Sequence, residues 1–260
     1  EMDYCDWSSD VCSSDLNTSD WEDYQGHGTH VAGIVGARDN GSGIVGVAPN
    51  VKLVAIRVLD ANGSGYYSDI ISALNYILTW KRNNPTAIVI VNMSLGGPAN
   101  SVFDSSVRNL VNNNILVVVA AGNEGRNVTT TSPARVLEAL TIGAYNPNNN
   151  VEASWSNFGT GVDLQAPGVN IDSTYKGTQY AVLSGTSMAS PMVAGAIACL
   201  LTKNPGLTTA LQIRNILVSD AVATTVKNYD NTNGSNPNIT LTRTQSNART
   251  TRRSVYVGKY

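Results

Sequence analysis

The two histidines of the chain lie in one glycine-rich segment, GHGTHVAG (26–33). Glycines on both sides of His27 allow the backbone to approach a reacting group closely. An imidazole in such a place is a candidate general base. His27 and His30 could instead suggest a zinc pair, but zinc sites use a longer histidine spacing or further ligands nearby, and none follows. We therefore predict that His27 takes up a proton during a reaction.

A serine stands at the expected start of a long apolar helix, in the segment GTSMASP (185–191). Serine at a helix start is ordinarily an N-cap. Here Ser187 follows a Gly-Thr turn and precedes small residues, which leaves room for a substrate carbonyl next to the positive helix end. The segment is not the G-x-S-x-G turn of esterases, because Ala189 replaces the second glycine. Ser187 is therefore a candidate nucleophile of another class.

Asn123 follows the most apolar strand expected in the chain, in the segment AAGNEG (120–125). Asparagine after a strand is usually a turn residue. Its amide could equally donate a hydrogen bond to an oxyanion, because open parallel sheets bind ligands at the carboxyl ends of their strands.

Apolar strands and amphipathic helices alternate along the chain. Near-continuous apolar strands separated by helices predict an α/β fold, a mostly parallel sheet with helices on both faces. The expected strands are 51–59, 87–91, 115–120, 137–142 and 162–165, and the expected helices are 69–82, 103–113, 187–203 and 208–218.

Taken together, these segments resemble the subtilisin-like serine proteases, nearest their proteinase K branch. The resemblance covers about residues 20–220. It rests on GHGTHVAGIVGA (26–37), GIVGVAPNVKLVAIRVLDANGSGYYSDI (43–70), NMSLGG (92–97), AAGNEG (120–125), SNFGTGVDLQAPG (156–168) and GTSMASPMVAGAIACLL (185–201). It implies a serine endopeptidase with the three-layer subtilisin fold and no cofactor for the chemistry.

The resemblance also implies a role for each matching residue. His27 would be the base, Ser187 the nucleophile, and Asn123 an oxyanion donor together with the Ser187 backbone N–H. Two extended edges would pair with the substrate backbone, and two small residues would line the pocket for the residue before the scissile bond. The edges are Ser94, Leu95 and Gly96 facing Gly63, Ser64 and Gly65, and the pocket residues are Ala121 and Gly122.

The aspartate that would complete the triad is missing from the pattern. The family places it at the end of an apolar strand, in Asp-Ser/Thr-Gly, a few dozen residues before the histidine. No such strand or tripeptide precedes His27, and Asp20 and Asp23 lie too close to it in a polar loop. We expect the fold to lack that strand and this chain to be poorly active.

The first residues look foreign to the rest. The string DWSSDVCSSDL (6–16) shows neither helical nor strand periodicity, and it is similar to translated sequencing adapter. A solvated acidic terminus is the alternative. We therefore divide the chain into a non-native segment 1–16, an N-terminally truncated peptidase domain 17–225, and a loop-rich end or basic tail 226–260.

The resemblance implies structural calcium at two places. The first is the loop ARDNGSGI (37–44), with the Asn40 side chain and the carbonyls of Arg38, Ser42 and Ile44. The second uses Asp163 with the carbonyls of Leu137 and Ala139. The first set would be incomplete, because the other ligands belong to the missing N-terminal part. Without calcium, 37–44 is simply a glycine-rich turn.

Charge excludes some partners. The chain has 17 basic and 19 acidic residues, a net charge of −2, so it has no general attraction for nucleic acid or anionic membrane. Eight acidic residues fall within 1–24 and five basic residues within 241–260. We expect a monomer that acts on proteins or peptides, secreted by resemblance although no signal peptide is visible. The alternative is an inactive peptide-binding module with the same fold.

Overall fold

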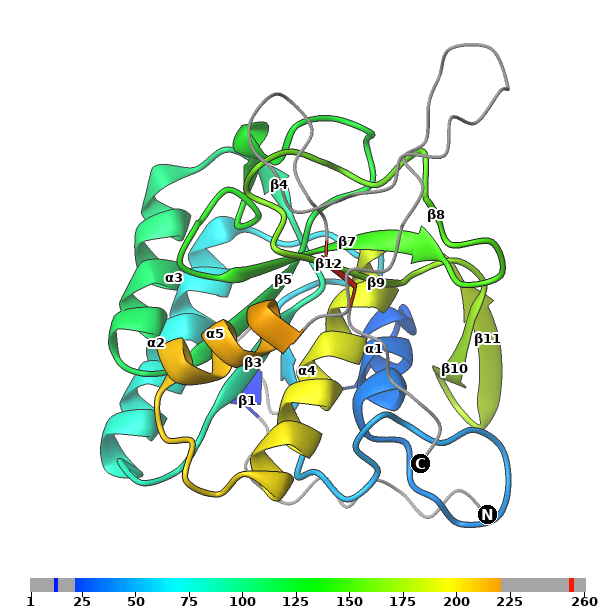
Figure 1. Cartoon of the computed structure of the whole chain (residues 1–260), viewed down its shortest axis with the longest axis horizontal. Coiled ribbons are helices and arrows are strands. Elements are labelled where there is room, and N and C mark those ends of the chain that lie inside the picture. The colour runs from blue at the N-terminus through cyan, green and yellow to red at the C-terminus, as the bar shows by residue number, and fades with distance from the viewer. Residues whose placement is uncertain (1–11, 14–21, 221–252, 255–260) are drawn as a thin grey trace.

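The computed structural model describes residues 12–13, 22–220 and 253–254. Its main sheet is mostly parallel, in the order β12-β9-β7-β5-β3, and β8 pairs antiparallel with β7 (Figure 1). The bounds are β3 Ile90–Met93, β5 Leu116–Ala120, β7 Leu140–Asn146, β8 Val151–Glu152, β9 Leu164–Pro167 and β12 Arg253–Ser254.

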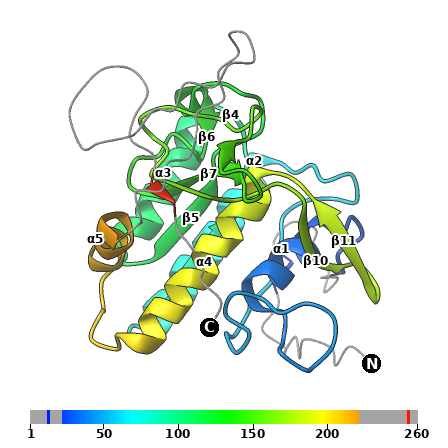
Figure 2. The same cartoon turned by 45° about the vertical axis from the view of Figure 1, so that its right-hand side comes forward.

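Helices cover both faces of this sheet, as the alternating pattern predicts (Figure 2). One core cluster joins α2 and α3 to the sheet, and the other joins α4 and α5 to its opposite face. Helix α1 packs against α4 and β10. The bounds are α1 His27–Gly36, α2 Tyr67–Asn83, α3 Ser101–Asn112, α4 Thr186–Lys203 and α5 Ala210–Asp220.

Strand β5 shows why the central strands read as unbroken apolar runs. All five of its residues are buried. Leu116 and Val118 belong to the cluster under α4 and α5, whereas Val117 and Val119 belong to the cluster under α2 and α3. Because successive side chains point to opposite faces, a strand covered on both sides must be apolar at every position.

The expected strand 51–59 is wrong for most of its length. Only β2, Ile56–Arg57, forms a ladder, and its partner is β1, Cys12–Ser13, in a separate parallel pair. Residues 51–54 alternate between half-buried and exposed without pairing as a strand in the described part of the chain. An apolar run therefore became extended chain, because strand formation depends on a neighbour as well as on the side chains.

Several short elements have no counterpart among the expected ones. The largest is the antiparallel hairpin β10–β11, which turns at Lys176 and Gly177. The turn needs glycine because Gly177 has φ +69°. The bounds are β10 Ile171–Tyr175, β11 Gln179–Leu183, β4 Gly97–Pro98, β6 Thr131–Ser132 and the 3₁₀ helix η1 Val128–Thr130.

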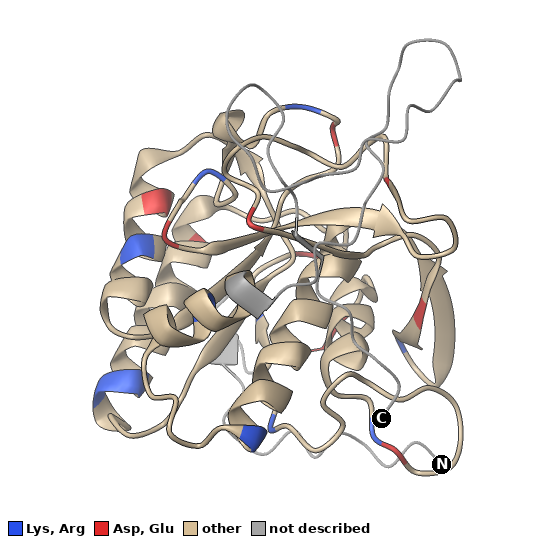
Figure 3. Ribbon diagram, in the orientation of Figure 1, with Lys and Arg blue, Asp and Glu red and all other residues tan. Residues whose placement is uncertain are grey.

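Most of the two predicted end segments lies outside the described residues. Of segment 1–16 the structure describes Cys12–Ser13, and of segment 226–260 it describes Arg253–Ser254. Charged residues of the described part are scattered over helices, loops and the β10–β11 hairpin (Figure 3). No described helix is both long and apolar enough to cross a membrane.

Candidate functional site

Ser187 lies in the first turn of α4, at the carboxyl end of the neighbouring strand β3. Its Oγ donates to the Ser94 carbonyl at 3.3 Å, and the Ser94 Oγ donates to the Ser187 carbonyl at 2.8 Å. Further along the helix, Ser190 donates to the side chain of Asn92 at 2.6 Å, and Asn92 donates to Ser94 Oγ at 3.0 Å. This chain of side chains ties the start of α4 to the end of β3 and fixes the Ser187 hydroxyl.

The side chain of Asn123 is oriented by Thr186. Its Oδ1 accepts from the Thr186 N–H and from the Thr186 hydroxyl, both at 2.9 Å. The same hydroxyl accepts from the Gly122 N–H at 3.0 Å. With its oxygen held in this way, Asn123 directs its NH₂ group elsewhere, and a Cβ built on Gly185 would lie 3.5 Å from Nδ2. The amide is thus available as a donor beside Ser187.

Six of the predicted site residues lie in the wall of one cavity of about 120 Å³. They come from three parts of the chain that meet at the carboxyl edge of the sheet, the ends of β3 and β5 and the start of α4. The lining residues are Leu95, Gly96, Gly97, Ala120, Ala121, Gly122, Asn123, Glu124, Thr131, Ser132, Ala134, Thr186 and Ser187. A nucleophile, an amide donor and a small-residue pocket are therefore contiguous.

His27 is the first residue of α1, and it is half-buried. It does not belong to the lining of the cavity described above. Burial lowers the pKa of His27 below 6.5, the negative charge of Asp23 partly opposes this, and His30 adds a smaller lowering effect. The ring is therefore neutral at pH 7, the state that a general base requires.

The turn before His27 is held by Asp23. One carboxylate oxygen accepts from the N–H groups of Gln25 and Gly26, at 3.1 and 2.7 Å, and the other accepts from the N–H and hydroxyl of Thr29, both at 2.7 Å. Burial alone would raise the pKa of Asp23, but these hydrogen bonds outweigh it and lower the pKa below 3.8. Since both oxygens bind the α1 terminus, Asp23 caps this helix.

Gly26 cannot be replaced by a larger residue. Its φ is +98°, and a Cβ there would lie 2.5 Å from the ring of Tyr175. The Tyr175 hydroxyl donates to the Gln25 carbonyl at 3.0 Å, while Gln25 Oε1 accepts from the His27 N–H at 2.7 Å. The β10–β11 hairpin therefore packs directly against the turn that carries His27.

The predicted edge 63–65 lies beside the histidine turn and is exposed. A Cβ built on Gly63 would come 3.8 Å from the Gln25 side chain. The Asp60 carboxylate shapes this loop by accepting from the N–H groups of Asn62 and Ser64, at 2.8 and 3.0 Å. The edge formed by residues 63–65 thus lies near the turn that carries His27. The edge formed by residues 94–96 lies next to Ser187.

His30 has a structural role in this molecule. It is fully buried, and its Nε2 lies 3.1 Å from the Ile171 carbonyl and 3.0 Å from the Ala181 carbonyl. Two carbonyl neighbours require a proton on Nε2. His30 therefore fastens α1 to both strands of the β10–β11 hairpin.

The second predicted calcium site does not suit a cation. The Arg214 guanidinium lies 2.5 Å from Asp163 Oδ1 and 3.4 Å from the Leu137 carbonyl, and Asp163 Oδ2 accepts from the Thr141 N–H at 2.9 Å. Burial raises the pKa of Asp163, although the Thr141 hydrogen bond and Arg214 oppose it. The arginine from α5 thus contacts two of the three predicted ligands, Asp163 and Leu137, and brings a positive charge where a cation was expected. Within the described part of the chain, no hydrogen bond links Ala139 to this pair.

The first predicted calcium loop offers few ligands. Asn40 Oδ1 accepts from the Ser42 N–H and hydroxyl, both at 3.3 Å. Arg38 and Ser42 are exposed, and Ile44 is half-buried. Across the described residues no three His, Cys, Asp or Glu side chains gather as a metal site. The loop alone therefore does not supply the six to eight oxygens that calcium takes.

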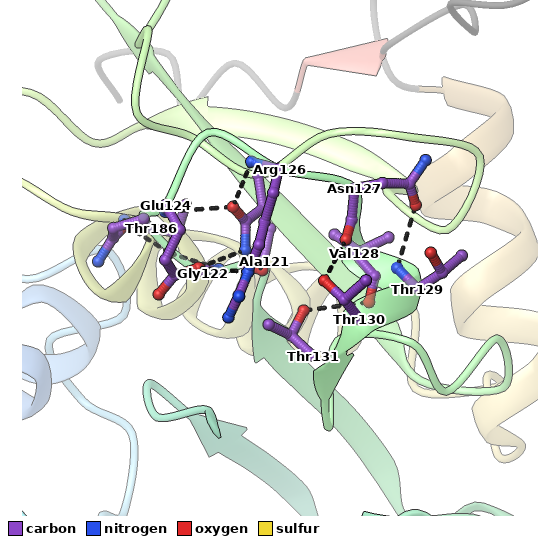
Figure 4. Close-up of polar contacts among 12 residues, drawn as sticks. Ala121, Gly122, Glu124, Arg126, Asn127, Val128, Thr129, Thr130, Thr131 and Thr186 are labelled. Atoms are coloured by element: carbon purple, nitrogen blue, oxygen red, sulfur yellow. Dashed lines mark hydrogen bonds and ion pairs between the residues drawn. The ribbon is translucent and has the colours of Figure 1, made fainter. Parts of the chain in front are cut away.

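Sequence reasoning missed Asn157, which is fully buried beside the turn carrying Asn123. Its amide donates to the Ala121 carbonyl at 2.9 Å and accepts from the Glu124 N–H at 3.1 Å. Figure 4 shows Ala121, Gly122, Glu124 and Arg126 gathered at this turn. The only available signal was the position of Asn157 in the segment SNFG (156–159), which carried no chemical hint.

Comparisons with known proteins agree with this architecture. The model of the Subtilase family matches residues 3–246. Subtilisin Savinase of Lederbergia lenta is 45% identical over 203 residues, which cover 78% of this chain and 72% of that protein. An alkaline protease of Alkalihalobacillus alcalophilus is also 45% identical over 203 residues, but the match spans only 51% of its length. The crystal structure of a cold adapted subtilisin-like serine proteinase has a TM-score of 0.77 and 35% identity, covering 98% of this chain and 84% of that one.

Proposed function

Because this chain belongs to the subtilase family, we propose that it is a serine endopeptidase that cleaves peptide bonds through an acyl-enzyme on Ser187. The observation that carries the proposal is the arrangement at the cavity. Ser187 and the oriented amide of Asn123 stand side by side at the start of α4, against a pocket of small residues.

In the proposed reaction His27 takes the proton of the Ser187 hydroxyl as Oγ attacks the scissile carbonyl. The Asn123 amide and the Ser187 backbone N–H donate to the oxyanion that forms. The positive end of α4 favours that negative charge. His27 then gives its proton to the leaving amine, and a water molecule releases the acyl group by the same steps in reverse.

We propose that the substrate is an extended protein or peptide segment. Ser94, Leu95 and Gly96 pair with its backbone on one side, and Gly63, Ser64 and Gly65 on the other. The side chain before the scissile bond enters the cavity at Ala121 and Gly122. The protein acts as a monomer, outside the cell, and without nucleic-acid or membrane partners.

We further propose that the triad aspartate is absent, and that residues 1–16 derive from adapter in place of the strand that carries it in a proteinase K-like parent. The occupation of both Asp23 oxygens by the α1 terminus supports this proposal, because Asp23 is then committed to its cap. In subtilisin, loss of the aspartate alone lowers turnover by about 3 × 10⁴. Poor activity of this chain follows.

Structural calcium is proposed only for the 37–44 loop, as an incomplete site formed by Arg38, Asn40, Ser42 and Ile44. No calcium is proposed at Asp163, where Arg214 supplies the positive charge. Thermal unfolding with calcium and with chelator tests both statements. A rise of the melting temperature with calcium that Asn40→Ala removes supports the loop site, and a rise that persists in that variant contradicts it.

The function is tested by hydrolysis of casein and of a succinyl-peptide chromogenic substrate, with Ser187→Ala as the matched inactive variant. We expect slow cleavage by the chain and none by Ser187→Ala. Turnover typical of an intact subtilisin would refute the missing aspartate. Peptide binding without any cleavage, unchanged in Ser187→Ala, would support the inactive peptide-binding module instead. Re-sequencing of the gene upstream of Trp21 tests the origin of residues 1–16.

A further inference from the structure

The turn that carries Asn123 is enclosed by one side chain from a distant segment. Asn157 is 0% exposed and uses its whole amide on this turn. Oδ1 accepts from the N–H groups of Glu124 and Arg126, at 3.1 and 3.0 Å. Nδ2 donates to the Ala121 carbonyl at 2.9 Å and to Glu124 Oε2 at 2.7 Å. Two donors and two acceptors exhaust the capacity of an amide.

These bonds surround Asn123 without touching it. The Asn157 amide reaches residues on both sides of Asn123, and the Asn157 backbone N–H donates to the Gly122 carbonyl at 2.9 Å. Gly122 has φ +101°, and a Cβ there would lie 2.3 Å from Asn157 Nδ2. Glycine at this position therefore lets the amide of Asn157 lie directly against the backbone of the turn.

The neighbouring segment reinforces the same turn through its backbone. The Gly125 N–H donates to the Trp155 carbonyl at 2.8 Å, and the Phe158 N–H donates to the Arg126 carbonyl at 3.0 Å. An ion pair adds little, because Arg126 Nε lies 3.7 Å from Glu124 Oε2 and both side chains are about half exposed.

Neither aspartate nor serine can reproduce all the hydrogen bonds of this amide. Aspartate keeps the two acceptors but places negative charge against the Ala121 carbonyl and the Glu124 carboxylate. Serine has one hydroxyl, which cannot reach both sides of the turn. Thr186 fixes the side chain of Asn123 and the N–H of Gly122. The Asn157 amide holds the rest of the turn backbone, at Ala121, Glu124 and Arg126.

We propose that Asn157 is a positioning residue for the oxyanion site. It holds the Ala121–Arg126 turn so that the Asn123 amide meets the oxyanion of a tetrahedral adduct on Ser187. This inference rests on the proposed function of Ser187 and Asn123. Displacing a group by about 1 Å from its productive position costs on the order of 10²-fold.

The test compares two ligands at equilibrium, so it does not require a complete triad. The Ser187 hydroxyl adds across the carbonyl of a peptide aldehyde: Oγ bonds to the carbonyl carbon as the C=O π bond breaks, and the hydroxyl proton passes to the former carbonyl oxygen. The product is a hemiacetal, and that oxygen lies in the oxyanion site. The matching peptide alcohol has no carbonyl at that end and forms no such bond. The ratio of their dissociation constants is measured by titration calorimetry on the full chain. It isolates the contribution of the covalent bond and of the oxyanion site to the binding of the aldehyde.

We expect Asn157→Ala to lower the aldehyde advantage by about 10²-fold, while the affinity for the alcohol changes by less than about threefold. The matched control is Asn114→Ala, at the opposite end of β5. Asn114 also links distant backbone, by donating to the Thr208 carbonyl at 2.8 Å and accepting from the Ala210 N–H at 2.7 Å. This control should lower the melting temperature but leave the ratio unchanged.

The outcomes separate the two proposals. If wild type shows an aldehyde advantage that Ser187→Ala abolishes, the function stands, and an unchanged ratio in Asn157→Ala overturns the role of Asn157. If wild type shows no advantage, or Ser187→Ala keeps it, the function itself fails. Should Asn157→Ala not fold, Asn157→Ser serves instead, with an expected loss of about tenfold and the same contradicting outcome.

Discussion

The first turns of α1 and α4 are capped in two different ways. Each helix places a proposed catalytic residue, His27 or Ser187, in its first turn after a glycine, and the two helices pack together. At α1 the free N–H groups are capped by Asp23, a charged residue only a few positions away. At α4 the Thr186 N–H is capped by Asn123, a neutral amide 63 residues away.

The difference in charge suits the two proposed tasks. A carboxylate near His27 stabilises the imidazolium that forms when the base takes a proton, and it raises the pKa of the ring. An oxyanion is expected at α4, where a carboxylate cap would repel it and cancel the helix dipole. A neutral amide caps α4 through its oxygen and leaves its NH₂ group for the reaction.

The largest expected effect on activity comes from replacing the neutral cap of α4 with a carboxylate, the kind of cap found at α1. Asn123→Asp keeps the acceptor for Thr186 but removes the donor and adds a negative charge. We expect kcat to fall by at least about 10²–10³-fold, the loss known in subtilisin for removing this type of donor. The melting temperature should stay near that of wild type. Peptide-hydrolysis kinetics that match wild type would show that Asn123 is a cap alone.

A smaller effect is expected when α1 loses its cap. Asp23→Ala should lower the free energy of unfolding by about 1–2 kcal/mol, as for other helix caps, in urea titrations at pH 7. Because the folded pKa of Asp23 is below 3.8, this stabilisation is present above pH 3.8 and disappears as pH falls through the folded value. A difference between variant and wild type that persists at the lowest pH would contradict the assignment.

The smallest expected effect is a shift in pH dependence. Activity requires neutral His27, whose pKa is lowered below 6.5 by burial. The acid limb of kcat/KM should therefore have its midpoint below pH 6.5. Asp23→Asn removes the charge that opposes the shift, so the midpoint should move lower still. A midpoint that moves upward in this variant would exclude Asp23 as an electrostatic neighbour of His27.

Local pattern sufficed for much of this molecule. Helices α2, α3, α4 and α5 and strands β3, β5, β7 and β9 lie close to their predicted positions, because each has a clear apolar period. The positions of Ser187 and Asn123 at a helix start and a strand end also followed from neighbouring residues. The prediction of a strand over 51–59 was wrong for most of its length, because a pairing partner, and not composition alone, decides whether a segment becomes a strand.

What the sequence determined by itself is therefore the order of elements and the residue types offered to the chemistry. Tertiary structure alone decided which polar groups became partners. In the folded structure His30 contacts two carbonyls of the hairpin, and Arg214 pairs with Asp163. Asn157 forms hydrogen bonds with the turn around Asn123. Those contacts join residues from 31 to 151 positions apart, and a period of two or 3.6 residues carries no information over such separations. Burial then makes them specific, because an unpaired polar group inside a protein costs free energy.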